Sequence, residues 1–390
     1  MTYDVAVIGS GLVGASTANA LVRRGAGRVL LLDRGAAGSG DSGLTFGMVR
    51  RHYTNPVLIE LAMAGTEILM HWDREVGVGA SGYVPTGYLL PVPDHLADVC
   101  RSQVERQRGL GLDTSFLTPE QIGDVEPLMA LDGVAGAAYE PAGGVCDARL
   151  MIGSWILDAL GRGLELRQQS PVAEIVMQGQ RATGVRLLSG ETISAGQVVV
   201  ATGGWAPELL SPAGWTPPMS LARIQVAVLR LPPGQVAPAA VTSDAVSNVV
   251  VRSAAGRDIW VVAYQPDTPV IDRRDDCQLA LLDGYEAAVR SALTARFPSL
   301  AAAPLVGGWG GAYDYTPDWH PLVGRVPDAE GLWICAGWSG HGLKSMPSIG
   351  RVMADLLTGN APTIDVTDLA PDRFARGVEN ALAYGPGARA

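Results

Sequence analysis

Three glycines near the N-terminus have the spacing of a loop that binds phosphate groups. Gly9, Gly11 and Gly14 form the pattern Gly-x-Gly-x-x-Gly, directly after an apolar run at 5–8 and directly before a helical pattern at 15–24. Glycines at these places allow a tight turn, a close approach of the backbone to a pyrophosphate, and close packing of the helix on the strand. The helix N-terminus offers free N–H groups and a positive dipole end to the phosphates. The pattern therefore predicts a βαβ unit that binds a dinucleotide.

Asp33 is placed to complete that site. It follows a second apolar run at 29–32, about 20 residues after the glycines, where a carboxylate accepts hydrogen bonds from ribose hydroxyls. The small-residue loop 35–43 comes next, and we expect its backbone to lie against the same ligand. The alternatives are an ordinary crossover without a ligand for the βαβ unit and a flexible connector for the loop.

Two later strands also end at glycines. The apolar run 197–202 stops at Gly203 and Gly204, and the run 332–336 leads through the segment 338–344 into a helical pattern. In open parallel sheets, ligands bind beyond the carboxyl ends of the strands. Because only one Gly-x-Gly-x-x-Gly unit lies on a βαβ frame, we expect one dinucleotide that is contacted by all of these strand ends.

The order of these patterns predicts a discontinuous α/β architecture, with a mostly antiparallel domain threaded between the pieces of a dinucleotide-binding domain. The expected pieces of the dinucleotide-binding domain are 1–82, 146–214 and 305–365, those of the second domain are 83–145 and 215–304, and 366–390 is a C-terminal tail. An amphipathic helix is predicted at 276–297. We expect the tail, which is rich in Ala, Gly and Pro, to be held loosely.

The composition limits the possible partners. With 390 residues, of which 47% are hydrophobic, the chain can form a large core, and its net charge of −10 argues against nucleic-acid binding. No apolar run reaches the roughly 18 residues of a membrane helix, and no secretory signal precedes the first strand. The widely separated cysteines fit a reducing cytoplasm and neither a disulfide scaffold nor a zinc site; they are Cys100, Cys146, Cys277 and Cys335. We therefore expect a cytoplasmic protein without a membrane partner or a metal, and the oligomeric state stays open.

Several blocks together resemble the D-amino-acid oxidase superfamily, and most closely its glycine oxidase and sarcosine oxidase branch of FAD-dependent amine oxidases. The blocks are Gly9–Gly14, Asp33, Ala201–Trp205, Tyr313–Asp318, Pro321–Gly324 and Ala336–Lys344. The resemblance covers nearly the whole chain in the right order. It implies an α/β (α+β) fold, in which a Rossmann-type FAD-binding domain of glutathione-reductase-like topology is interleaved with a mostly antiparallel substrate domain. It also implies that FAD takes a hydride from the carbon next to an amine, that the imine hydrolyses, and that O2 reoxidises the flavin and gives H2O2.

The resemblance also implies how the substrate is held. Sarcosine-type oxidases hold a substrate carboxylate between an arginine and a lysine, whose counterparts here are Arg50 and Lys344. Two cations from distant segments suit a carboxylate better than a neutral amine. The alternative for Arg50 and its neighbour Arg51 is a solvated surface pair. Tyr313 matches a tyrosine that lines the substrate cavity. The residues expected to shape the pocket around the N-substituent are Met48, Trp260, Tyr264 and Trp338.

The residues expected to contact FAD come from all parts of the predicted cofactor domain. They are Gly9, Gly11, Leu12, Val13, Gly14, Asp33, Arg34, Ser39, Gly40, Ser42, Gly47, Met48, Val172, Ala201, Thr202, Gly203, Trp205, Gly311, Gly340, His341, Gly342, Leu343 and Lys344. For His341 the alternative is a structural histidine. The helix predicted at 347–357 would direct its positive end towards the flavin pyrimidine.

Three departures from the family pattern affect the function. Gly311 stands where monomeric sarcosine oxidase has the cysteine that binds FAD covalently, so we expect non-covalent FAD. The lysine that activates oxygen in sarcosine-type oxidases should lie in 258–264, where we find Trp260; Lys344 is the only lysine in the chain. Gly47 stands where the sarcosine oxidase branch often has a second arginine that covers the flavin, whereas the pair Gly47-Met48 resembles glycine oxidase.

We therefore expect an oxidase of a glycine-type or N-substituted amino acid with a free carboxylate. The apolar pocket residues favour a substituent larger than methyl. One alternative is an FAD-dependent dehydrogenase that passes electrons to a partner or a quinone, which Trp260 in place of lysine supports. The other is a flavin-binding protein without turnover.

Overall fold

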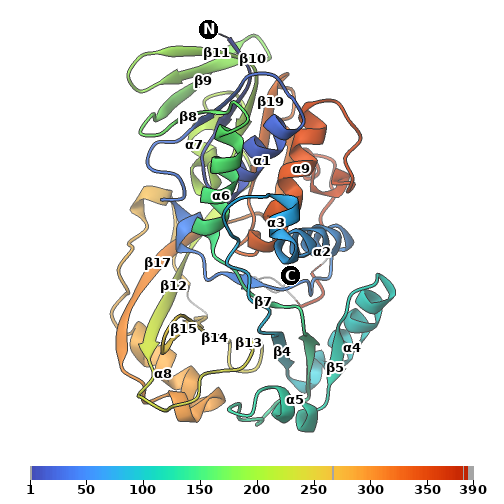
Figure 1. Ribbon diagram of the computed structural model, residues 1–390, viewed down its shortest axis with the longest axis vertical. Helices are drawn as coiled ribbons and strands as arrows, with labels where there is room; N and C mark the ends of the chain where they lie inside the picture. The colour runs from blue at the N-terminus through green and yellow to red at the C-terminus, as the bar shows by residue number, and fades with distance from the viewer. Residues whose placement is uncertain (1, 266–267, 381, 385–390) are drawn as a thin grey trace.

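Two β-sheets lie at opposite ends of the elongated molecule (Figure 1). The structure is a computed structural model, and it describes residues 2–265, 268–380 and 382–384. Among these residues, no helix is both long and apolar enough to span a bilayer. The four cysteines are buried and free. The mixed α/β architecture agrees with the predicted fold class.

The first sheet joins the N-terminal, central and C-terminal parts of the chain. Its order is β18 (Leu322–Arg325), β19 (Leu332–Ala336), β11 (Thr192–Val200), β1 (Thr2–Ile8), β2 (Val29–Leu32) and β8 (Glu165–Arg167). All neighbours on this path are parallel except β18 and β19. The antiparallel strands β9 (Val172–Gln178) and β10 (Arg181–Leu187) extend from β11. The carboxyl ends of β1, β2, β11 and β19 therefore meet at one edge.

Helices cover both faces of this sheet. On one face α1 (Leu12–Arg23), α6 (Ala148–Leu160) and α9 (Met346–Leu357) share a core with Val7 and Leu31 (Figure 1). Helix α2 (Pro56–Met70) adds to this face, and a short helix α3 (Trp72–Glu75) follows it. On the other face α7 (Ala206–Leu210) packs with side chains of β9 and β10.

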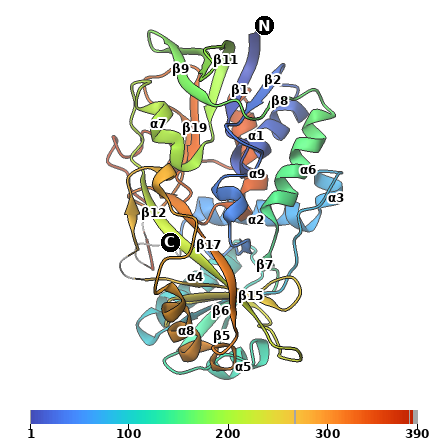
Figure 2. The same cartoon turned by 90° about the vertical axis from the view of Figure 1, so that its left-hand side faces the viewer.

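The second sheet is mostly antiparallel. Its order is β16 (Val270–Ile271), β12 (Ser220–Arg230), β15 (Asp258–Ala263), β14 (Val249–Ser253), β13 (Val241–Asp244), β4 (Tyr88–Val92), β6 (Gly136–Glu140) and β5 (Ser115–Leu117). The strand β17 (Leu305–Tyr315) pairs with β12, and Figure 2 shows these two long strands side by side. The third predicted piece of the dinucleotide-binding domain starts at residue 305, but its first strand, β17, pairs with β12 of this second sheet. The division into domains otherwise stays a prediction.

Three helices lie around the second sheet: α4 (Asp94–Gly109), α5 (Pro119–Val125) and α8 (Tyr285–Arg296). The predicted helix at 276–297 is wrong in its first part, because Gly284 has a φ of +81° and the helix begins only after it. A two-stranded sheet of β3 (Met48–Val49) and β7 (Gly144–Val145) completes the fold.

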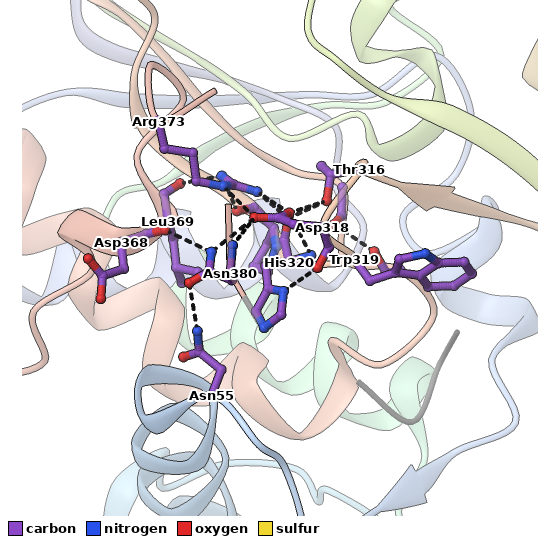
Figure 3. Close-up of polar contacts among 12 residues, drawn as sticks. Asn55, Thr316, Asp318, Trp319, His320, Asp368, Leu369, Arg373 and Asn380 are labelled. Carbon is purple, nitrogen blue, oxygen red and sulfur yellow. Dashed lines mark hydrogen bonds and ion pairs between the residues drawn. The ribbon is translucent and has the colours of Figure 1, made fainter. Parts of the chain in front are cut away.

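The C-terminal segment is tied to the body by a buried ion pair (Figure 3). Arg373, with no exposed side-chain surface, places Nη2 2.8 Å from Oδ1 of Asp318. Asn380 donates to the same carboxylate, and Asn55 at the start of α2 donates to Asn380. The hydroxyl of Tyr384 lies 2.8 Å from Nε2 of His52. The expectation of a loosely held tail is therefore wrong for these described residues.

Candidate active site

The glycine loop between β1 and α1 packs closely against the neighbouring backbone at Gly9 and Gly14. Gly9 has a φ of +98°, and a Cβ there would lie 2.5 Å from the carbonyl oxygen of Ala201. A Cβ on Gly14 would lie 1.7 Å from the oxygen of Gly9, so only glycine allows the helix to start this close to the strand. The carboxylate of Asp33 accepts hydrogen bonds from the backbone and the hydroxyl of Ser10, at 2.6 and 2.7 Å.

Two adjoining cavities run along the carboxyl edge of the first sheet. They share a wall formed by Gly11, Asp41, Ser42, Ala201 and Gly203. Eighteen of the residues expected to contact the cofactor line one or both: Gly9, Gly11, Leu12, Val13, Asp33, Arg34, Ser39, Gly40, Ser42, Val172, Ala201, Thr202, Gly203, Trp205, Gly311, Gly340, Gly342 and Leu343. A dinucleotide-binding edge therefore extends from the N-terminal loop to the segment before α9.

The chemistry of this edge fits a dinucleotide. The N-cap of helix α1 is Gly11, which has no side chain to cap the helix; the N–H of Leu12 donates to the hydroxyl of Ser42 at 3.1 Å, and the rest of the N-terminus is available to phosphate oxygens. The buried Oγ1 of Thr202 has no hydrogen-bond partner among the described residues. Asp314 also lines the edge, and burial raises the pKa of its carboxyl to about 6. A helix N-terminus and an unpaired hydroxyl are groups that a ligand with phosphates and hydroxyls would satisfy.

Several residues of this edge had no sequence signal. Nε of Arg274 lies 2.6 Å from Oδ2 of Asp41, and Asp41 also accepts from the backbone N–H of Ala312. The indole N–H of Trp309 donates to the carbonyl of Leu44 at 2.7 Å. These contacts join residues more than two hundred positions apart, so no local pattern could have identified them.

A third, smaller cavity adjoins the one of these two cavities that Gly311 and Gly340 line. The two share Phe46, Tyr313 and Gly340. The smaller cavity contains four of the residues expected around the substrate or the flavin ring, together with Tyr313: Met48, Tyr264, His341 and Lys344. Gly340 has a φ of +73°, and a Cβ there would lie 2.2 Å from the Tyr313 ring. Burial, together with the neighbouring Tyr264, raises the pKa of Tyr313 well above its usual value. Tyr313 is therefore neutral in this cavity.

The structure brings Arg50 and Lys344 together. Their side chains are 2% and 1% exposed, and both lie over the ring of Tyr53, with Cζ of Arg50 4.1 Å and Nζ of Lys344 5.0 Å from its centre. The guanidinium of Arg50 donates to the carbonyl of His52. Burial and the charge of Arg50 hold the pKa of Lys344 well below its ordinary value. Lys344 lines the small cavity, whereas Arg50 is not among the lining residues.

Arg51 has a different role from Arg50. Its Nε lies 2.9 Å from Oε2 of the fully buried Glu140, and the same carboxylate accepts from the backbone N–H groups of Arg51 and His52. The alternative of a solvated Arg50–Arg51 pair is therefore wrong, since both side chains are buried. Glu140, which the sequence did not single out, fixes the loop that carries Arg50.

His341 lines the small cavity, and Trp260 lies outside its lining. Nε2 of His341 lies 3.1 Å from the carbonyl oxygen of Trp319, and burial with the charge of Lys344 holds its pKa well below the ordinary value, so the ring is neutral. Trp260 does not line this cavity and packs edge-on against Trp309, with 4.7 Å between the two ring centres.

Fold and cavities together define an α/β architecture whose sheet edge is suited to a dinucleotide. A family model for FAD dependent oxidoreductases, the DAO family, matches residues 4–356. The chain belongs to this family, which confirms the resemblance noted in the sequence, and its cofactor is FAD. The eighteen residues that line the two adjoining cavities are therefore candidates to hold FAD.

Individual relatives are distant and extend over nearly the full length. The chain is 27% identical to the glycine oxidase of Geobacillus kaustophilus, over 96% of this chain and 97% of that protein. It is 26% identical to a sarcosine oxidase subunit beta of an Arthrobacter species, over 96% and 92%. The structure of L-proline dehydrogenase from P. horikoshii superposes with a TM-score of 0.88 at 24% identity, covering 97% of this chain and 99% of that one.

Proposed function

We propose that this protein oxidises the C–N bond of a glycine-type or N-substituted amino acid that carries a free carboxylate. The observation that carries the proposal is the pair of buried cationic side chains, Arg50 and Lys344, over Tyr53. Lys344 lines the small cavity, which adjoins a cavity proposed to hold FAD. FAD, when bound, supplies the acceptor for the hydride that leaves the carbon next to nitrogen. The rest of the reaction depends on how the side chains hold the substrate.

Lys344 and Arg50 would hold the carboxylate. A carboxylate that approaches Nζ of Lys344 favours the charged ammonium and balances the charge of Arg50. Fixing this end of the substrate sets the distance of the carbon next to nitrogen from the flavin. A neutral amine without a carboxylate would leave two like charges close together in a buried site, so the pair selects amino acids.

Tyr264, Tyr313 and Met48 would form the walls around the amine end. Because Tyr313 is neutral and lies beside Tyr264, the two side chains would offer hydroxyl groups and ring faces to the substrate. His341 is also neutral, so this end of the cavity accepts an uncharged amine, the form from which hydride transfer proceeds. Trp260 shapes the cavity through Trp309 and Phe46 and does not line it.

The cofactor would be held without a covalent bond. Gly311 lines the cavity and has no nucleophile. Cys335 also lines it, and burial raises the pKa of its thiol to about 12, so it stays a neutral thiol. The free cysteines also support our proposal of a cytoplasmic location.

The electron acceptor has two candidates. O2 is the acceptor in the oxidase proposal, whereas Trp260 in the place of a family lysine favours a dehydrogenase. To test the function, the purified yellow protein is mixed without oxygen with glycine, N-alkylglycines, and D- and L-amino acids. Bleaching by at least one amino acid supports the proposal, and no bleaching by any of them overturns it. Oxygen uptake compared with dye reduction for the active compound then identifies the acceptor.

A further inference from the structure

Arg252 is a buried arginine for which the proposed reaction has no role. It lies on β14, is 8% exposed, and no carboxylate of the described residues lies within ion-pair distance of it. Nη1 donates to the carbonyl of Ser253 at 3.1 Å, and Nε has no hydrogen-bond partner among the described residues. Buried charges in proteins are usually paired, so this one requires an explanation.

Arg252 lies on the face of the second sheet that forms the small cavity. Val250 and Val262 are paired across β14 and β15 and line that cavity, and Arg252 and Trp260 are the next pair on the same face. Two residues along a strand span about 7 Å. The backbone of Arg252 therefore lies one same-face position beyond Val250, which lines the cavity.

The aromatic rings around Arg252 hold its head group next to the cavity. Its Cζ lies 3.9 Å from the centre of the Trp260 ring and 5.3 Å from that of Phe46, which lines the cavity. Nη2 lies 3.6 Å from the point that a Cβ on Gly47 would occupy, directly before the lining residue Met48. That distance is an ordinary van der Waals contact, so the guanidinium lies directly beside the backbone at Gly47.

The charge of Arg252 acts in the same region as that of Lys344. Both lower the pKa of the buried thiol of Cys146, which burial raises. Burial lowers the pKa of Arg252 only to about 10, so it is a cation at neutral pH. Arg252 is thus a third buried cation near the small cavity, in addition to Lys344 and Arg50.

We propose that Arg252 recognises a second acidic group, so that the substrates are amino acids with an additional carboxylate on the N-substituent or side chain. This inference rests on the proposed function. The guanidinium would use its unpaired Nε–H and its second terminal nitrogen for one carboxylate, in the forked geometry that arginine offers. Phe46 and Trp260 would exclude water from this ion pair.

The test uses inert acids that imitate the two substrate classes. Glutarate has the shape of iminodiacetate with a methylene in place of the nitrogen, and butyrate corresponds in the same way to sarcosine. Binding of each acid to the flavin-loaded protein is followed by the change in the flavin spectrum. We expect glutarate, or the longer adipate, to bind at least about tenfold more tightly than butyrate, as for one hydrogen bond between charged groups. The Arg252→Met substitution should reduce this ratio to about one.

Two further variants complete the experiment. Arg252→Lys keeps the charge and should retain part of the preference for diacids, which also separates lost recognition from misfolding. Arg257→Met, at an exposed position of the same hairpin, should leave the ratio unchanged. Equal binding of butyrate and both diacids to the unsubstituted protein, or a ratio that Arg252→Met does not change, would overturn the inference. If monoacidic amino acids bleach the flavin in that case, only this inference fails; if no amino acid does, the proposed function fails.

Discussion

Nζ of Lys344 lies 5.0 Å from the centre of the Tyr53 ring, and Cζ of Arg50 lies 4.1 Å from the centre of the same ring. One aromatic side chain therefore supports the only lysine of the sequence and a buried arginine together. Attraction between a cation and the face of a ring offsets part of the cost of burying each charge. The remaining repulsion between the cations is what a substrate carboxylate would relieve.

The first prediction concerns the pH dependence of carboxylate binding. Because the pKa of Lys344 is well below its ordinary value, the side chain loses its proton at a lower pH than an exposed lysine. A bound carboxylate favours the charged form and raises the pKa, so binding takes up a proton. The affinity for butyrate should be highest at pH values at which butyrate is ionised and Lys344 is still charged, and should fall as the pH rises above the pKa of Lys344 in the ligand-free protein.

The single lysine makes this pKa directly measurable. Protein labelled with ¹⁵N at the lysine side chain should give one lysine Nζ signal in NMR, whose titration reports Lys344 alone. We expect the midpoint to move upward when butyrate is added. A midpoint near that of an exposed lysine, or one that butyrate does not move, would contradict this account of the site.

The second prediction is that Lys344→Met separates binding from stability. The substitution should weaken butyrate binding by about tenfold to a hundredfold, the range for a hydrogen bond to a charged group. It should also raise the free energy of unfolding by about 1 kcal/mol or more, because it removes a buried like-charge neighbour of Arg50. Titration of the flavin spectrum and denaturant unfolding measure the two effects. A variant that loses stability together with binding would show that Lys344 is structural.

The third prediction concerns the C-terminal ion pair in Figure 3. Arg373→Met leaves the buried carboxylate of Asp318 without its cation, and should lower the free energy of unfolding by about 3–5 kcal/mol. Arg376→Met, which removes an exposed pair with Asp372, should change it by less than about 1 kcal/mol. Similar losses in both variants would contradict the importance of the buried pair.

The Arg373–Asp318 pair also predicts how the free energy of unfolding depends on pH. Arg373 lowers the pKa of Asp318 from 3.8 to about 2, against the effect of burial. A carboxylate with a lowered pKa contributes stability that is fully present above its unfolded-state pKa and is lost as the pH falls through the folded-state value. The difference in stability between the native protein and Arg373→Met should therefore narrow below about pH 4.

The fourth prediction is that the flavin is released by denaturation. With Gly311 at the place of the family's linking cysteine and the Cys335 thiol held neutral, no nucleophile at these two positions can form a bond with the ring. Acid precipitation should leave all of the yellow colour in the supernatant. Flavin that stays with the precipitated protein would contradict this.

The sequence identified those parts of the site that local patterns determine. The turn at Gly9, the carboxylate of Asp33 and the glycines before Lys344 lie within short segments whose spacing has a direct physical reason, and the structure places them on one cavity edge. The family resemblance extended this to Arg50. The start of α2 also has a local cause, because the side chain of Asn55 accepts from the backbone N–H groups of Val57 and Leu58.

The parts that the sequence did not reveal depend on distant contacts. Glu140 fixes the Arg51 loop across 89 positions, and Arg274 reaches Asp41 across 233. Arg252 looked like an ordinary strand residue, because its significance comes from an Nε that has no hydrogen-bond partner among the described residues and from the rings beside it. The tail was misjudged for the same reason, since its composition does not show that Arg373 pairs with Asp318.

The most direct test of the central claim compares an acid with its amide. Sarcosine and sarcosine amide share the reacting C–N bond, and only sarcosine has the carboxylate that Lys344 and Arg50 would bind; N-carboxymethyl and other N-substituted glycines and their amides extend the comparison. We predict that, without oxygen, the acid of at least one pair bleaches the bound flavin at least about tenfold faster than its amide, and that Lys344→Met removes this difference. Equal rates for acid and amide in every pair that reacts, or no bleaching by any acid, would contradict the account.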